Sequence, residues 1–336
     1  MSPARIPTLT VADIQRLLPM ISDIQELTPG GQKQVFKATL AGATVAVKVL
    51  LPDRDPDGVP VDAQASTVVV DPSAPTATVA PDVSENEESW SDLIPARLRR
   101  EVDLLASITA PTVVPLVEIS GERIRHVTDH GRRYLVYAEA WIDGQDLNAY
   151  LDRGRTRMPQ AEVVRLALDM LSAIAALWDQ EVVHRDIKPH NIIRRQDGRF
   201  VLIDLGLALD LQGDTITETG AWLGTPVFAA PEINDPELRD RVDFRADEFS
   251  LGLVLYEALS ARHPYNARMA GRTVTDVRRK FREKPMPLAT SDVVVDRTFA
   301  EVIMRMIDTD MSLRFARLAQ LESALRSIAQ RLGVQP

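Results

Sequence analysis

The sequence predicts an α+β protein of two lobes, in which a small antiparallel sheet lobe precedes a larger, mainly helical lobe. Early in the chain, β-branched residues alternate with other residues in three short runs, and the dipeptide Ala41-Gly42 separates the last two. Period-two alternation is typical of strands, and a tight turn between two strands makes them antiparallel. After residue 95 the apolar spacing becomes that of helices. The early strands are expected at residues 24–27, 35–40 and 44–50.

Helices dominate the later part of the chain. Their apolar residues recur every three or four positions, and Pro near a helix start is tolerated because its missing N–H would be unpaired there. Short strands interrupt the series at residues 133–138, 192–194 and 199–203. The expected helices are residues 95–108, 159–180, 247–260, 273–281, 297–307 and 318–332.

The pattern divides the chain into three segments. Residues 1–22 are an N-terminal helical extension, with an amphipathic helix from Thr10, its N-cap, to Ile21. Residues 23–142 form the sheet lobe, and residues 143–333 form the helical lobe.

Residues 52–89 interrupt the sheet lobe with a stretch rich in Pro, Asp, Ser, Thr and Ala. Between Pro52 and Asp92, ten acidic residues accompany one basic residue, Arg54, a local charge equal to the formal net charge of −9 for the whole chain. Few large apolar side chains are present to offset the entropy of ordering, so we expect a disordered acidic insertion. It fits either a solvated spacer or a segment that recruits a basic partner.

The composition limits the partners and the location of the protein. Cys is absent, which excludes disulfides, thiolate metal sites and cysteine nucleophiles. The net charge of −9 argues against nucleic acid as a partner, since phosphate binding needs a basic face. No signal peptide and no membrane span of ~20 apolar residues is visible. We therefore expect a cytoplasmic protein, and its oligomeric state is unknown from the sequence.

The run HRDIKPHN, residues 184–191, carries the clearest chemical signal. Asp186, Lys188 and Asn191 place a carboxylate, an ammonium and an amide close together. Phosphoryl transfer needs such a set: a carboxylate to orient the attacking hydroxyl, a cation for the moving charge and an oxygen for a metal. A polar turn with these residues by chance is the alternative. Further along, an apolar strand ends in Asp204, whose burial favours a cation such as magnesium beside it.

These residues resemble the catalytic loop and the metal-binding triplet of eukaryotic-type (Hanks-type) serine/threonine protein kinases, and the compact chain is similar to soluble bacterial members. The resemblance implies the two-lobed protein kinase fold, ATP as the phosphate donor and Mg²⁺, with Mn²⁺ as the alternative. It implies that Asp186 is the catalytic base and that Lys188 neutralises the γ-phosphate. Asn191 and Asp204 would hold the metal.

Lys48 and Glu101 are expected to form a buried ion pair. In the strand TVAVKVL, Ala46 and Lys48 share one face because strand side chains alternate. Glu101 falls on the apolar stripe of its helix, where a carboxylate needs a buried cation. A solvated lysine at a sheet edge is the alternative. The two resemble the ATP-orienting Lys and Glu of the family, which implies that Lys48 also contacts the phosphates of ATP.

The phosphate-covering loop matches the family pattern least well. Aligning this loop on Val35 keeps Gly30 at its expected position, with Gly31 beside it. Backbone N–H groups at these glycines would approach phosphate. The resemblance implies that the two glycines, Val35 and Ala46 contact the nucleotide.

The connection between the lobes aligns with the hinge of the family. This alignment puts residues 139–142 beside adenine and Asp146 near the ribose. It also makes Glu139 an acidic residue where an apolar residue or Thr is usual, which suggests a shift of one residue in the alignment.

The run GDTITETGAWLGTPVFAAPE resembles an activation segment. The resemblance implies that Thr225 contacts the catalytic loop, which favours Ser/Thr over Tyr substrates. Arg185 stands next to the base, and a phosphothreonine would supply an anion for it to bind. An unregulated Thr-rich loop is the alternative. The candidate phosphorylation sites are Thr215, Thr217 and Thr219.

Two structural anchors complete the resemblance, which covers about residues 24–332. Asp247 is expected to support the backbone of the catalytic loop, and Glu232 is expected to pair with Arg314. The implied function is transfer of the γ-phosphate of ATP to Ser or Thr hydroxyls of protein substrates, including the chain's own activation segment. A pseudokinase that acts as a binding or scaffold module and a small-molecule kinase are the alternatives.

Overall fold

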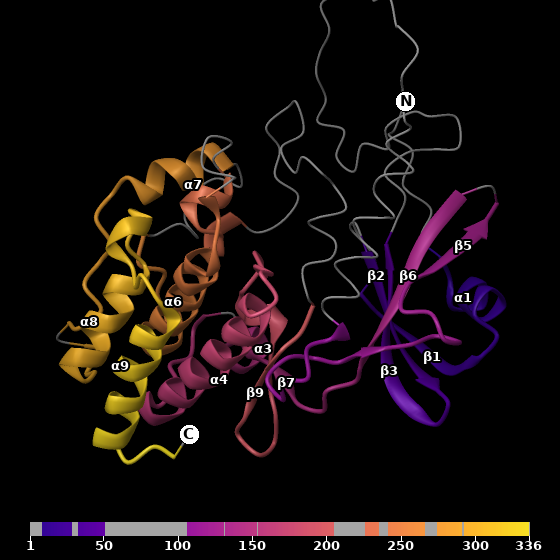
Figure 1. The fold of residues 1–336 in the computed structure, drawn as a ribbon, viewed down its shortest axis with the longest axis horizontal. Helices are drawn as coiled ribbons and strands as arrows, with labels where there is room; N and C mark the ends of the chain where they lie inside the picture. The colour runs from indigo at the N-terminus through magenta and orange to yellow at the C-terminus, as the bar shows by residue number, and fades with distance from the viewer. Residues whose placement is uncertain are drawn as a thin grey trace, which may run out of the picture. The chain divides into compact units, whose positions relative to one another are not determined.

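The computed structural model describes residues 9–28, 33–50, 106–130, 132–152, 154–204, 226–234, 241–265, 274–290 and 292–335. The chain divides into two compact units, Met1–Asp103 with Leu116–Trp141, and Leu104–Pro115 with Ile142–Pro336. The first contains the larger sheet and the second contains most of the helices (Figure 1). The two-lobed α+β prediction is thereby confirmed. The predicted insertion, residues 52–89, lies outside the described residues.

Strands of the first unit form one antiparallel sheet with the neighbour order β1-β2-β3-β6-β4, and β5 also pairs with β6. Alternate residues of the central strand β3, namely Val45, Val47 and Val49, are buried in the core, as the period-two pattern requires. The strands β4 and β5 were not anticipated from the sequence. The bounds are β1 Ile21–Thr28, β2 Lys33–Leu40, β3 Ala43–Leu50, β4 Leu116–Val117, β5 Arg125–Asp129 and β6 Arg132–Ala140.

A short helix, α1 (Val11–Leu17), packs beside β1 and β5 in this unit (Figure 1). Thr10 caps it as predicted, in a reciprocal capping box with Asp13. The prediction that the helix continues to Ile21 was wrong, because Ile21 begins β1. The residue before Pro19 is disfavoured in the α conformation, so the helix ends there.

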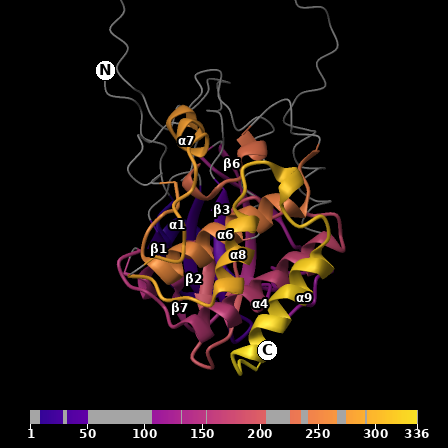
Figure 2. The same cartoon turned by 90° about the vertical axis from the view of Figure 1, so that its left-hand side faces the viewer.

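The second unit is built around two buried helices, α4 and α6. Helix α4 contacts α6 and α9, and α6 contacts α8, so the four helices lie side by side (Figure 2). No helix in the described ranges is long and apolar enough to cross a membrane. The bounds are α3 Leu147–Tyr150, α4 Gln160–Trp178, α6 Phe244–Ser260, α7 Val274–Phe281, α8 Arg297–Met306 and α9 Leu318–Arg331.

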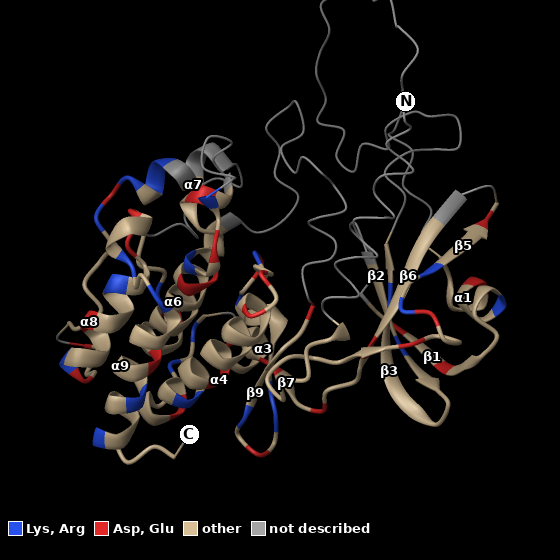
Figure 3. Ribbon diagram, in the orientation of Figure 1, with Lys and Arg blue, Asp and Glu red and all other residues tan. Residues whose placement is uncertain are grey.

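Helix α9 shows how the helical periodicity acts. Its buried residues Leu321, Leu325 and Ile328 recur at helical spacing, whereas Glu322 and Arg326 are exposed and pair with each other. Figure 3 shows that α9 carries both charged and other residues along its length. The expected later helices are present to within a few residues at each end. Only residues 106–108 of the expected helix 95–108 are described.

A small three-stranded sheet, β7 (Gln145–Asp146), β8 (Ile192–Arg194) and β9 (Phe200–Leu202), also belongs to the second unit. It positions the loop of residues 184–191, because β8 follows directly after Asn191 in the chain. The β8–β9 register pairs Ile192 with Leu202, and Leu202 also bridges to Val113. The segment after β9 is therefore held beside the end of the loop.

Candidate active site

The loop of residues 184–191 holds the Asp186 carboxylate between a cation and an amide. Lys188 Nζ donates to both carboxylate oxygens of Asp186, at 2.9 Å and 2.7 Å. Asn191 Nδ2 donates to Asp186 Oδ2 at 2.8 Å and to the Asp186 backbone oxygen at 2.9 Å. Hydrogen bonds to an ionised oxygen are short and strong, so these contacts orient the carboxylate. The three side chains that the sequence analysis selected here do lie together.

Asp247 anchors the same loop from the first turn of α6. Its two oxygens accept the backbone N–H of His184 at 2.7 Å and that of Arg185 at 2.9 Å. Arg185 has φ of 66°, a left-handed conformation that is costly for a non-Gly residue and needs such support. Burial raises the pKa of Asp247, while His184 and the two donated bonds oppose the rise. The predicted support of the loop backbone is confirmed.

Asn191 and Asp204 are brought near each other by the β8–β9 pairing. The N–H of Ile203 donates to the backbone oxygen of Asn191 at 2.8 Å, and Asp204 follows at once in the chain. Because the Asn191 amide nitrogen is directed at Asp186, the amide oxygen is the side-chain atom that remains for a metal. An amide oxygen and a carboxylate are oxygen donors of the kind that hard divalent cations bind, so the two residues fit a site for a divalent metal.

Lys48 forms its described ion pair with Glu139, in the sheet unit. The distance from Lys48 Nζ to Glu139 Oε2 is 2.6 Å, and the two side chains are 5% and 3% exposed. Strand β6 pairs with β3 so that Glu139 lies opposite Ala46 and Tyr137 lies opposite Lys48. Sequence analysis singled out Glu139 as unusual but missed this contact. The contact follows from the register of β3 against β6, which places the two charges on the same face of the sheet.

Of the other predicted site residues, three are described by the structure and seven are not. Val35 lies opposite Lys48 on β2, and Ala46 lies two residues before Lys48 on β3, so both belong to the sheet unit. Asp146 caps α3 by accepting the N–H of Ala149 at 2.9 Å. The following predicted residues lie outside the described part of the chain: Gly30, Gly31, Glu101, Thr215, Thr217, Thr219 and Thr225.

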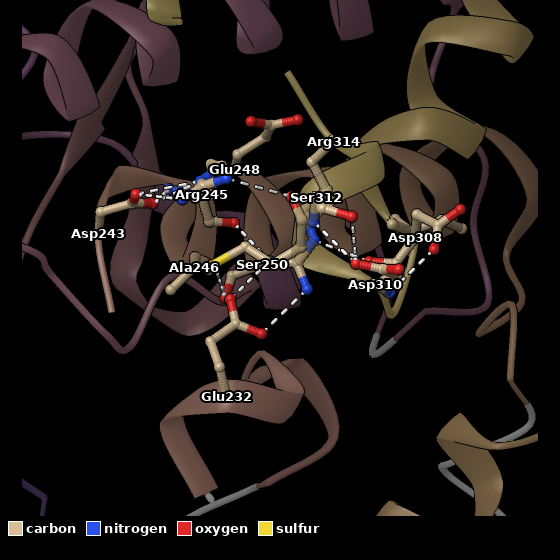
Figure 4. Close-up of polar contacts among 12 residues, drawn as sticks. Glu232, Asp243, Arg245, Ala246, Glu248, Ser250, Asp308, Asp310, Ser312 and Arg314 are labelled. Carbon is tan, nitrogen blue, oxygen red and sulfur yellow. Dashed lines mark hydrogen bonds and ion pairs between the residues drawn. The ribbon is translucent and has the colours of Figure 1, made fainter. Parts of the chain in front are cut away.

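The predicted pair of Glu232 and Arg314 is confirmed (Figure 4). Arg314 NH1 and NH2 donate to the two oxygens of Glu232 at 2.6 Å and 3.0 Å, with both side chains fully buried. Arg314 also donates to the backbone oxygens of Asp308 at 2.7 Å and Arg245 at 2.8 Å. This guanidinium therefore links the segment that contains Glu232 to α6 and to the turn before α9.

Comparison with known proteins agrees with this geometry. A family model described as "Protein kinase domain" matches residues 78–326, more than half of the chain, a range that contains the catalytic loop but begins after Lys48.

Curated relatives include bacterial serine/threonine-protein kinases. A probable serine/threonine-protein kinase of Streptomyces coelicolor is 28% identical over 222 residues, 66% of this chain and 31% of the relative. PrkC of Bacillus subtilis is 26% identical over 232 residues, 69% of this chain and 33% of the relative. PknH of Mycobacterium tuberculosis is 31% identical over 202 residues, 59% of this chain and 30% of the relative. The chain thus spans about a third of the length of these three relatives.

Proposed function

Because the chain belongs to the protein kinase domain family, we propose that it transfers the γ-phosphate of ATP to Ser or Thr hydroxyls of protein substrates. The observation that carries the proposal is the Asp186 carboxylate, oriented by Lys188 and Asn191 on a loop that Asp247 anchors. The names of the relatives support this function over the scaffold and small-molecule alternatives.

In the proposed mechanism Asp186 accepts a hydrogen bond from the substrate hydroxyl and takes its proton as the phosphoryl group transfers. Lys188, 2.7 Å from this carboxylate, stabilises the negative charge that the γ-phosphate oxygens carry in the transition state. No covalent intermediate on the protein is required. The loop acts by orienting the hydroxyl and by placing a fixed positive charge, which is how phosphoryl transfer is generally accelerated.

Mg²⁺ is the proposed metal, with Mn²⁺ as the alternative, and Asn191 and Asp204 would hold it through oxygen atoms. When bound, it neutralises phosphate charge. We assign Lys48 to the α- and β-phosphates of ATP, in the sheet unit, with Val35, Ala46, Gly30 and Gly31 as the further nucleotide contacts.

Four further assignments are proposed on the basis of sequence. Phosphorylation of Thr215, Thr217 or Thr219 would switch the activity through Arg185, and Thr225 favours Ser/Thr substrates. A triple Ala variant with the full specific activity of the wild type would reject the switch. The absence of Cys supports a reducing, cytoplasmic location, and the charge of −9 argues against nucleic acid as a partner.

Transfer of labelled phosphate from ATP to the chain itself and to a generic Ser/Thr substrate protein tests the function. Asp186→Asn should lower turnover by at least about a thousandfold while leaving ATP affinity within about twofold, since the carboxylate acts on the hydroxyl. Asp197→Asn, in an exposed turn of the same unit, is the matched control. Retained activity in Asp186→Asn would refute the assignment of Asp186 as the base, and an inactive wild type would refute the proposed function.

A further inference from the structure

Lys48 and Glu139 form a buried ion pair that the sequence analysis did not foresee. The N–O distance is 2.6 Å and the two side chains are 5% and 3% exposed. A charge in such surroundings is costly unless an opposite charge meets it, so each side chain compensates the burial of the other. The pair therefore helps to fix the position of the Lys48 ammonium.

The backbone beneath the pair is continuous hydrogen-bonded sheet. Strands β3 and β6 keep one antiparallel register from Val45 opposite Ala140 to Leu50 opposite Leu135. Lys48 and Glu139 are diagonal neighbours in this register, on the same face, which brings long side chains within reach. The contact thus depends on the sheet alone, whereas the predicted partner Glu101 belongs to a different segment of the chain.

The ion pair uses one oxygen of the Glu139 carboxylate. An ammonium has three N–H donors, and Glu139 Oε2 receives one of them. Glu139 Oε1 is buried without a hydrogen bond to any described residue. Lys48 Nζ also lies 5.7 Å from the centre of the Tyr137 ring. Glu139 therefore contacts the ammonium through a single N–H donor and one of its own two carboxylate oxygens.

We propose that Glu139 is a positioning residue that holds the Lys48 ammonium for ATP, in addition to any contact made by Glu101. The proposal rests on the assignment of Lys48 to the ATP phosphates. Glu139 acts through Lys48 and is not itself assigned a contact with ATP. Its replacement by a neutral residue should leave Lys48 poorly oriented and weaken the use of ATP specifically.

The kinetic test compares Glu139→Gln with the wild type. We expect KM for ATP to rise and kcat/KM for ATP to fall about tenfold or more, with KM for the protein substrate unchanged. A purely structural role would lower the fraction of active enzyme, and hence kcat, with both KM values unchanged. An unchanged kcat/KM for ATP would overturn the proposal, because Lys48 would not need Glu139. An increased kcat/KM would overturn it as well, because Glu139 would then compete with the ATP phosphates for Lys48.

Two further variants keep the test decisive. Glu139→Asp retains the charge with a shorter reach, so it should be more active than Glu139→Gln, and equal or lower activity would count against positioning. Glu118→Gln, at an exposed Arg123 pair in the same unit, is the matched control and should behave as wild type. If Glu139→Gln does not fold, the Asp variant alone decides.

A measurement without turnover separates this inference from the proposed function. The rate at which an amine-reactive reagent modifies Lys48, followed by peptide mass spectrometry, should increase in Glu139→Gln relative to wild type because the carboxylate that pairs with the ammonium is removed. Equal rates would overturn the positioning role. The modification rate can be measured even if the wild type transfers no phosphate. In that case the proposed function is rejected, and the modification rate alone tests the contact of Glu139 with Lys48.

Discussion

Replacing Glu232 by Gln should destabilise the protein more than replacement of any exposed carboxylate. The change keeps the size of the side chain and removes its charge, so Arg314 stays buried without its counter-ion (Figure 4). The amide oxygen can accept only one of the two guanidinium bonds now at 2.6 Å and 3.0 Å, and the amide N–H groups would face the other donor. The expected effect is therefore the cost of breaking a buried pair.

Breaking a buried ion pair costs about 3–5 kcal/mol, roughly a third to a half of a typical unfolding free energy of about 10 kcal/mol. For a unit of this size that corresponds to a fall in Tm of roughly 6–20 °C. Arg314 keeps its bonds to the backbone oxygens of Asp308 and Arg245, which limits the loss to the pair itself.

Urea unfolding followed by circular dichroism measures the free energy, and a thermal scan measures Tm. The control is Glu322→Gln in the exposed pair with Arg326, where the two side chains are 48% and 57% exposed and the expected change is well under 1 kcal/mol. A free energy for Glu232→Gln within about 1 kcal/mol of wild type would refute the reasoning, because it would mean that the buried guanidinium does not need its partner.

Three further outcomes are expected in the second unit. Burial raises the pKa of Glu248 from 4.5 to about 8, so the folded state keeps a proton that the unfolded chain loses, and the free energy of unfolding falls as pH rises between these values. Glu248→Gln should flatten this fall, as measured by urea midpoints across that pH range, and parallel curves for the variant and the wild type would contradict the reasoning. Gly252→Ala places a Cβ 2.7 Å from Ile307 Cγ2. The overpacking cost of about 1–3 kcal/mol should outweigh a helix-propensity gain of about 1 kcal/mol and lower Tm. A Tm at or above that of the wild type would reject this prediction. Asp247→Asn leaves one backbone N–H of the catalytic loop without an acceptor. The variant should lower the free energy of unfolding in urea by about 1–3 kcal/mol and should slow phosphate transfer. Unchanged values in both assays would contradict the anchoring role.

Much of the fold could be predicted because its elements are long and periodic. Strand β3 and helices α4, α8 and α9 carry patterns that no other arrangement satisfies as well. The two-residue strands β4 and β7 could not be found in this way, because pairing with distant strands defines them rather than local pattern. The end of α1 was misplaced although Pro19 marked it, since the apolar spacing continued past the proline.

The candidate site was predictable where its residues are close in the chain. Asp186, Lys188 and Asn191 belong to one loop, so their spacing alone indicated their proximity. Lys48 and Glu139 are 91 residues apart, and their contact follows from the register of β3 against β6. A register shift of one residue would have turned Glu139 to the opposite face, so no pattern within either strand specifies the pair.

Three buried carboxylates differ in how completely they are satisfied, and that difference separates their roles. Both oxygens of Asp247 accept backbone N–H groups, and both oxygens of Glu232 accept from Arg314. Glu139 gives one oxygen to Lys48 and keeps the other without a hydrogen bond among the described residues. Buried polar groups are normally satisfied, and a complete set of partners favours a rigid structural anchor. Of these three carboxylates, the one with spare capacity lies beside the lysine that we assign to ATP, where the partners must change as the nucleotide binds and leaves. Glu248 Oε2 also lacks a hydrogen bond among the described residues, so spare capacity marks a functional role only together with that position.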